Sequence, residues 1–194
     1  MTKRFIAEQK RLNLKKIIYN YVEEPFIIEP IYINCEENIR EPVTHTTCEY
    51  EENKIKKIVS FSGKSTIGGM FDKLIDLYCR DYPSLNTLEF VEYSTLPTFN
   101  PKSKTNSEAP VEVRINISSS GKEAIPFRKF DSSVLRASIQ CVFDCVQYYV
   151  NSEMCFKKLK FLIKEAQSRS RSDVAQKYIS DISEIVKVTS YSDV

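Results

Sequence analysis

The stretch IVSFSGKSTIGGMFDKLIDLY, residues 58–78, decides the fold because its apolar residues change their spacing at Gly63. Before this glycine the segment is rich in β-branched and aromatic residues, which is typical of a strand. After it, apolar residues recur every three or four positions and predict one face of an amphipathic helix. They are Ile67, Met70, Phe71, Leu74, Ile75 and Tyr78.

The residues before this stretch predict two more strands and a helix. Residues 43–51 and 54–62 flank Glu52-Asn53 and predict a hairpin. Residues 26–37 predict another strand, interrupted at Pro30 because proline cannot donate to a strand ladder. Residues 3–22 predict a helix that ends before Pro25. The first half of the chain therefore contains a β-β-β-α unit.

The same order of elements recurs about 65 residues later. Residues 88–96 and 111–119 predict strands, separated by a polar loop over 100–110, and a short strand follows Gly121. Asp131, Ser132 and Ser133 are good N-cap residues for the next helix. Two such units can bury their apolar faces together, so the predicted fold class is α+β, a layered domain.

Beyond Val150 the pattern is helical again. Two apolar stripes, separated by the polar segment SRSRSD (168–173), predict a helical hairpin. The expected organisation is an N-terminal basic helix in residues 1–25, a repeat domain in 26–152 and a C-terminal helical extension in 153–194.

Composition excludes several classes of function. The 194 residues include a single histidine, His45, which argues against His-rich metal sites, and no apolar run is long enough to span a membrane. Net charge is +5 over residues 1–22, −8 over 23–53 and +5 over 156–171. Because no stacking-aromatic or glycine-rich motif accompanies the basic segments, solvated faces and internal complementarity are favoured over nucleic-acid binding.

The six cysteines form no C-x-x-C pair and no zinc spacing. The N-terminus has basic residues but no apolar signal region. Reduced thiols and a cytoplasmic location are therefore expected.

Few residues suggest catalysis. His45 lies in a Thr-rich strand segment, and Asp72 and Asp76 are expected on a solvated helix face. The segment SGKST (62–66) lacks the earlier glycine of a phosphate-binding loop, since that position is Ile58. The amides that follow Gly63 nevertheless open a helix and suit an anion such as a carboxylate.

Three segments, residues 61–96, 111–123 and 132–150, resemble the C-terminal regulatory domain of the 2-isopropylmalate and citramalate synthases. That family has a G-N-G-P-V-x-A-L turn, a Y-P-x-L segment, an L-V-D-Y strand and a long helix with A-S-x-Q. The residues that fit this pattern are Gly63, Ile67, Tyr82-Pro83, Leu85, Val91-Glu92-Tyr93, Ala137, Ser138, Gln140, Asp144 and Tyr148. The Y-P-x-L segment and the long helix look more like the citramalate branch.

The resemblance implies a site for an inhibitory branched-chain amino acid, leucine or isoleucine. The residues expected to form this site are Gly63, Lys64, Ser65, Thr66, Ile67, Gly68, Gly69, Tyr93, Asp131, Ser132 and Ser133. The ligand carboxylate is expected at the amides after Gly63, its side chain at Ile67 and Tyr93, and the second turn at its ammonium or carboxylate. Gly68 and Gly69 depart from the family pattern and predict either a wider pocket or a looser first helical turn.

The resemblance covers about residues 26–150 and not the family's catalytic half, a metal-dependent barrel with an H-x-H ligand pair. It implies a free-standing regulatory domain, not an enzyme and without a cofactor, that forms a homodimer and modulates a separate acyl-transferring synthase. An alternative hypothesis is a structural or protein-interaction module that kept the fold and lost the effector. A small enzyme is a third hypothesis, disfavoured because no nucleophile or acid–base pair is identifiable. Neither nucleic acid nor membrane is expected as a partner.

Overall fold

The computed structural model describes residues 3–38, 40–97, 109–187, 189 and 191, with side chains from residue 9 onward. The predicted α+β class is confirmed. The expected polar loop over 100–110 lies almost entirely outside the described residues. In chain order the elements are α1 (Lys3–Tyr21), β1 (Ile28–Asn38), β2 (Val43–Glu52), β3 (Ile55–Gly63), α2 (Thr66–Tyr78), the 3₁₀ helix η1 (Pro83–Thr87), β4 (Leu88–Pro97), β5 (Val111–Ser119), β6 (Ile125–Asp131), α3 (Val134–Ser168) and α4 (Ser172–Val186).

The described strands form two antiparallel sheets of the same design, β1-β2-β3 and β4-β5-β6, each followed by a helix. The register of β1 against β2 shifts between Pro30 and Tyr32, and that of β4 against β5 shifts between Phe90 and Glu92. Both shifts come directly after the third residue of the first strand in each sheet. The predicted interruption at Pro30 is thus a bulge within one strand, and the duplication of the unit extends to this detail.

The two helix starts are also duplicated. Ser65 caps α2, where its hydroxyl accepts a hydrogen bond from the Gly68 amide (3.2 Å). Ser133 caps α3 and accepts in the same way from the Arg136 amide (3.3 Å). The expected N-cap at the second turn is confirmed, with Ser133 as the capping residue. In each unit, therefore, the last strand of the sheet is followed by a helix that a serine caps.

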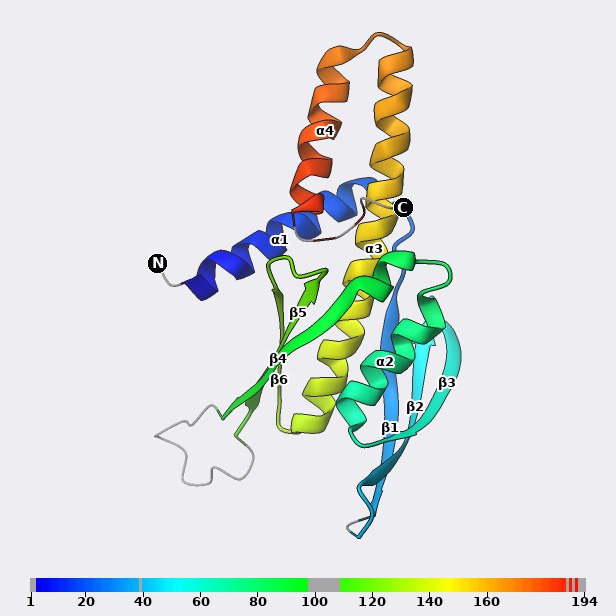
Figure 1. Ribbon diagram of the computed structural model, residues 1–194, viewed down its shortest axis with the longest axis vertical. Coiled ribbons are helices and arrows are strands. Elements are labelled where there is room, and N and C mark those ends of the chain that lie inside the picture. Colours follow the sequence, from blue (N-terminus) through cyan, green and yellow to red (C-terminus); the bar gives the residue numbers. More distant parts are fainter. Residues whose placement is uncertain (1–2, 39, 98–108, 188, 190, 192–194) are drawn as a thin grey trace.

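Helix α3 is the centre of the core and runs between the two sheets (Figure 1). It packs against β5, β6 and β1, and also against α2, α1 and α4. From Ala137 to Phe156 it is buried nearly all round, as expected of a helix enclosed by other elements. Both units thus share one core.

The hairpin of α3 and α4 projects from one end of the molecule (Figure 1). The expected boundary between residues 152 and 153 falls inside α3, which runs without a break to Ser168. Side chains on both sides of that position hold the helix to the body. Asn151 bonds the backbone of Phe26 in both directions, and buried Glu153 accepts the Ser84 amide (3.0 Å). The extension therefore shares its helix with the repeat domain.

None of the described helices is both long enough and apolar enough to cross a membrane.

Candidate functional site

The first strand–helix turn presents free backbone amides. Ser65 Oγ satisfies the amide of Gly68, and the Ser65 carbonyl accepts from Gly69 (2.9 Å). Within the described chain, the amides of Thr66 and Ile67 have no hydrogen-bond partner. These are the groups that a helix N-terminus offers to an anion.

Gly69 is required for close packing at this turn. A Cβ built on it would lie 2.8 Å from Cδ2 of Phe61, closer still to Cε2, and 3.3 Å from Cζ. A Cβ on Gly68 would meet only Ser65, at an ordinary 3.5 Å. The expectation that both glycines widen a pocket is therefore wrong for Gly69, because the Phe61 ring fills the space beside it.

A hollow of about 400 Å³, here called the first-turn hollow, lies at this turn. It is lined by Phe61, Ser62, Gly63, Lys64, Ser65, Gly68, Gly69, Asp72, Lys73 and Asp76. Its two lysines and two aspartates form no ion pair within the described residues. Charges of both signs face the hollow, while Phe61 is its one large apolar side chain.

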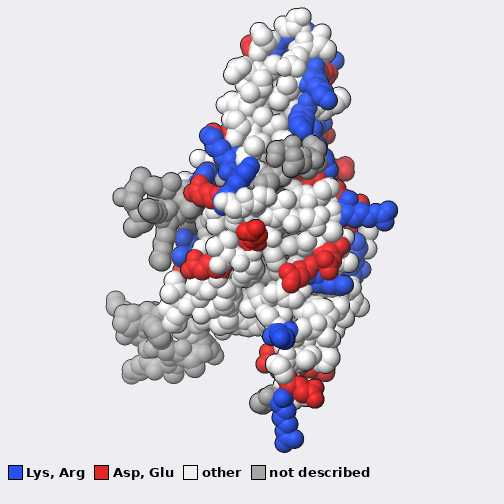
Figure 2. Space-filling model, viewed as in Figure 1, with Lys and Arg blue, Asp and Glu red and all other residues white. Residues whose placement is uncertain are grey.

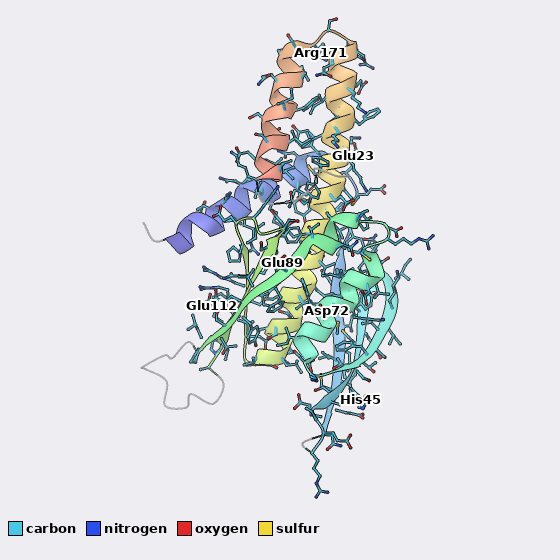
Figure 3. All side chains as sticks on the ribbon, viewed as in Figure 1. Glu23, His45, Asp72, Glu89, Glu112 and Arg171 are labelled. Atoms are coloured by element: carbon cyan, nitrogen blue, oxygen red, sulfur yellow. The ribbon has the colours of Figure 1, made fainter. Side chains whose placement is uncertain are left out.

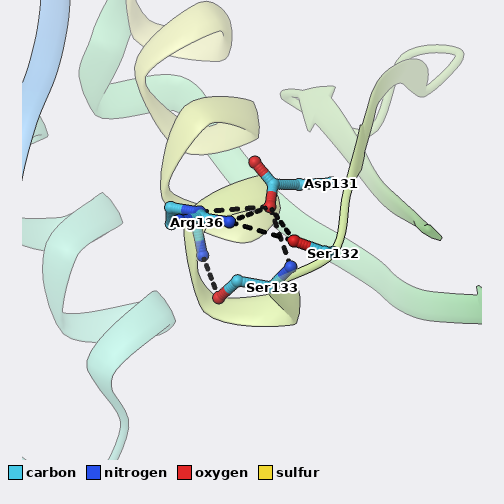
Figure 4. Close-up of polar contacts among 4 residues, drawn as sticks. All are labelled: Asp131, Ser132, Ser133 and Arg136. Carbon is cyan, nitrogen blue, oxygen red and sulfur yellow. Dashed lines mark hydrogen bonds and ion pairs between the residues drawn. The ribbon is translucent and has the colours of Figure 1, made fainter. Parts of the chain in front are cut away.

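At the second turn the polar groups already bind one another (Figure 4). Asp131 Oδ1 accepts from the Ser133 amide (2.8 Å) and from Nε and Nη2 of Arg136 (3.1 and 2.7 Å). Arg136 Nη2 also donates to Ser132 Oγ (3.1 Å). The hydrogen bonds from Arg136 hold the pKa of Asp131 below its usual range, so the carboxylate is ionised at neutral pH.

A second hollow of about 470 Å³, the second-turn hollow, lies between β1 and the start of α3. It is lined by Pro30, Ile31, Tyr32, Ile33, Ser133, Leu135, Arg136, Ile139 and Gln140. Aliphatic side chains from both units form its walls, and the cation of Arg136 lies on its rim. The Val134 and Leu135 amides at this end of α3 have no hydrogen-bond partner in the described chain. The hollow therefore combines an apolar wall with an anion-binding end.

The structure does not bring all the predicted site residues together. Residues 63–65, 68 and 69 line the first-turn hollow, whereas Ser133 lines the second-turn hollow. Ile67 packs against the core, and the Tyr93 hydroxyl hydrogen-bonds Ser138 on α3 (2.9 Å). Tyr93, Asp131 and Ser132 line neither hollow. The expected convergence of all these residues on one ligand is not present within the single chain.

Sequence interpretation missed most of the second-turn hollow. Leu135 and Arg136 directly follow the predicted N-cap, so the N-cap motif could have indicated the anion-binding end of the hollow. Residues 30–33 come from the other unit, about 100 residues earlier in the chain, and no local pattern connects them to α3. Only the tertiary packing of α3 against β1 reveals that wall.

The residues considered for catalysis lie apart. His45 is exposed near the free end of the first sheet, where its Nδ1 hydrogen-bonds Ser62 Oγ (2.7 Å) (Figure 3). In the same view Asp72 lies on α2, away from His45, and Asp76 follows one turn later on the same helix, where both aspartates line the first-turn hollow. Among the described residues, no group of three His, Cys, Asp or Glu could hold a metal ion.

The first strands of both sheets expose apolar side chains. On β4 these are Phe90, Val91, Tyr93 and Leu96, and on β1 they are Ile31 and Tyr32. Over β4 and α2, the face drawn in Figure 2 is largely uncharged, interrupted by acidic side chains that include Glu89. An exposed apolar strand at a sheet edge is a surface that commonly pairs with another chain.

Comparison with protein-family models and with curated proteins gives no match for this chain.

Proposed function

We propose that the chain is a free-standing regulatory domain that binds leucine or isoleucine and modulates a separate acyl-transferring synthase. It acts in the cytoplasm as a homodimer, and it catalyses no reaction itself. The resemblance to the isopropylmalate and citramalate synthase regulatory domain suggests this function. The observation that carries it is the second-turn hollow, which offers aliphatic walls beside an anion-binding helix N-terminus.

The hollow assigns a role to each part of an amino-acid ligand. The carboxylate binds at the Val134 and Leu135 amides. Arg136 adds a hydrogen bond from Nη1, since its Nε and Nη2 are already bonded to Asp131 and Ser132. The branched side chain lies against Ile31 and Ile139. Asp131 already holds Arg136, so it could take the ligand's ammonium only by giving up that ion pair. We therefore assign the second turn to the carboxylate.

Calorimetry with leucine and with isoleucine tests the binding. Arg136→Gln and Ile31→Gln should each weaken the affinity by roughly tenfold, since each removes one ion pair or one aliphatic contact. Arg80→Gln and Ile58→Gln are the matched controls, because both residues are exposed and line neither hollow. The proposal is supported if the parent chain gives saturable heat and only Arg136→Gln and Ile31→Gln weaken the affinity.

A chain that gives no heat with either amino acid is not an effector sensor. If that chain is nevertheless dimeric, the exposed apolar strands favour the alternative of a protein-interaction module. Light scattering is the measurement of the dimer, and a monomer at micromolar concentration contradicts this part of the proposal.

The dimer proposal commits to β4. Val91→Lys should shift the population to monomer, because Val91 is exposed among the apolar side chains of that strand. Ile55→Lys on β3 introduces the same charge at an isoleucine that is even more exposed, and it should leave the dimer intact.

Pure chain should not transfer acetyl groups from acetyl-CoA to pyruvate or 2-oxoisovalerate. Measurable turnover by the pure chain, in a preparation without contaminating synthase, would contradict the proposed role.

A further inference from the structure

A third hollow lies beneath α1, farther along α3 than the second turn. Helix α1 packs across α3 and β6 and leaves a space of about 170 Å³ between them. This space, here called the α1 hollow, is lined by Arg11, Lys15, Ile18, Phe127, Lys129 and Tyr148, among others. It shares no lining residue with either turn hollow.

The charge of the α1 hollow is unbalanced. Lys129 is neutralised by an ion pair with Asp144 (2.9 Å). Arg11 lies over the Phe127 ring (5.3 Å to its centroid) and Lys15 over the Tyr19 ring (5.6 Å). Within the described chain, neither Arg11 nor Lys15 has a carboxylate partner. Two cations therefore face a small, partly apolar space without a counter-ion.

Tyr148 provides an independent observation. It lines the hollow, only 9% of its surface is exposed, and its buried hydroxyl has no hydrogen-bond partner in the described chain. Burial raises the pKa of Tyr148 despite the opposing effect of Arg11, so the hydroxyl remains a proton donor at neutral pH. A buried donor without an acceptor is costly, and an anionic oxygen is the acceptor that would satisfy it.

We propose that the α1 hollow is a second ligand site, which binds a small carboxylate with an apolar or aromatic body. Arg11 and Lys15 hold the carboxylate. The Tyr148 hydroxyl is closed off from the hollow in this structure, so a small displacement of α1 on binding must open it before it donates a hydrogen bond to the carboxylate. The apolar body rests on Phe127 and Ile18. The size fits, because an apolar cavity of roughly 150 Å³ holds benzene.

Benzoate is the probe, because it joins a carboxylate to a ring of that size. Nuclear magnetic resonance titration should show saturable binding, with shifts at the amides of α1 and of residues 147–148. Benzamide has the same shape without the charge and should bind at least about fivefold more weakly. Saturating leucine should leave the benzoate affinity unchanged, because the two hollows share no residue. A failure of leucine binding would therefore not affect this test.

Variants locate the site. Lys15→Gln should weaken benzoate binding roughly three- to tenfold, whereas Lys16→Gln should not, because Lys16 is exposed on α1 and does not line the hollow. Tyr148→Phe should weaken binding severalfold without lowering the stability of the free protein, since it removes a hydroxyl that has no partner.

Three results would each overturn the proposal. They are equal binding of benzoate and benzamide, equal effects of Lys15→Gln and Lys16→Gln, and an unchanged benzoate affinity in Tyr148→Phe. Competition by inorganic phosphate at the same concentration as benzoate would also contradict it, because phosphate has no apolar body.

Discussion

The contrast between Gly68 and Gly69 gives the sharpest test of the packing at the first turn. The two glycines are neighbours in α2, and alanine is the better helix former at both. They differ in what a methyl group would meet. At Gly68 the nearest atom is 3.5 Å away, whereas at Gly69 the Phe61 ring lies within 2.8 Å.

Gly68→Ala should therefore stabilise the protein by about 0.5–1 kcal/mol through helix propensity and the unfolded chain. Gly69→Ala gains the same amount but must displace the Phe61 ring, and such overpacking costs about 1–3 kcal/mol. We expect Gly69→Ala to be net destabilising and to unfold at a lower urea concentration than Gly68→Ala.

Urea denaturation followed by circular dichroism measures the difference, provided that both variants keep the same dependence on urea. The Phe61→Ala background is the decisive control. Without the ring, Gly69→Ala should become as stabilising as Gly68→Ala, which gives a coupling energy of about 1–3 kcal/mol between Gly69 and Phe61. Equal effects of the two alanines in the parent chain, or no coupling, would refute the close approach of α2 to Phe61.

Other predictions concern the core. Glu153→Ala should destabilise the protein by about 3 kcal/mol, because Glu153 is wholly buried and makes both an ion pair and an amide hydrogen bond. Glu165→Ala should cost less than about 0.5 kcal/mol, because the ion pair of Glu165 is exposed. The urea midpoints of the two variants measure the difference. Iodoacetamide at pH 8, followed by mass spectrometry, should modify Cys35 and Cys79 well before the buried cysteines, because burial raises the pKa of three thiols to about 12, those of Cys48, Cys141 and Cys155. Burial also raises the pKa of Tyr149. Above about pH 10 the phenol therefore loses its proton in the unfolded chain but not in the folded one, and the stability of the protein should fall as pH rises. Urea midpoints at about pH 8 and about pH 10.5 should differ less in Tyr149→Phe than in the parent.

The elements were predictable from sequence because each has a local physical signal. The change of spacing at Gly63 marks the junction of β3 and α2, and Asn53 sits in the tight turn between β2 and β3 with a positive φ, as a hairpin requires. Pro30 revealed the first bulge. The matching bulge at Val91 has no proline or glycine to mark it, so only the strand register exposes it.

The candidate site was predictable only in part, because a site is a tertiary arrangement. The serine caps were visible as motifs, but the partners of each turn were not. Gly69 suggested open space, and the structure shows a ring from the preceding strand in that space. Arg136 stood beside the predicted N-cap, yet its pairing with Asp131 depends on the bend of the chain between β6 and α3. The length of α3 was also hidden, because the buried polar residues Asn151, Ser152 and Glu153 interrupt its apolar pattern in the middle of the helix.

If the proposed regulatory function holds, duplication explains why the second-turn hollow suits the ligand better than the first. The two turns are equivalent by topology and by their serine caps, but their surroundings differ. At the first turn, all of the lining comes from one unit, over residues 61–76. At the second turn, β1 of the first unit and α3 of the second form opposite walls. A ligand bound there contacts both units, so its affinity depends on how they pack, and by linkage its binding biases that packing. Such coupling between units is what the proposed regulatory function requires for effector binding to affect a partner.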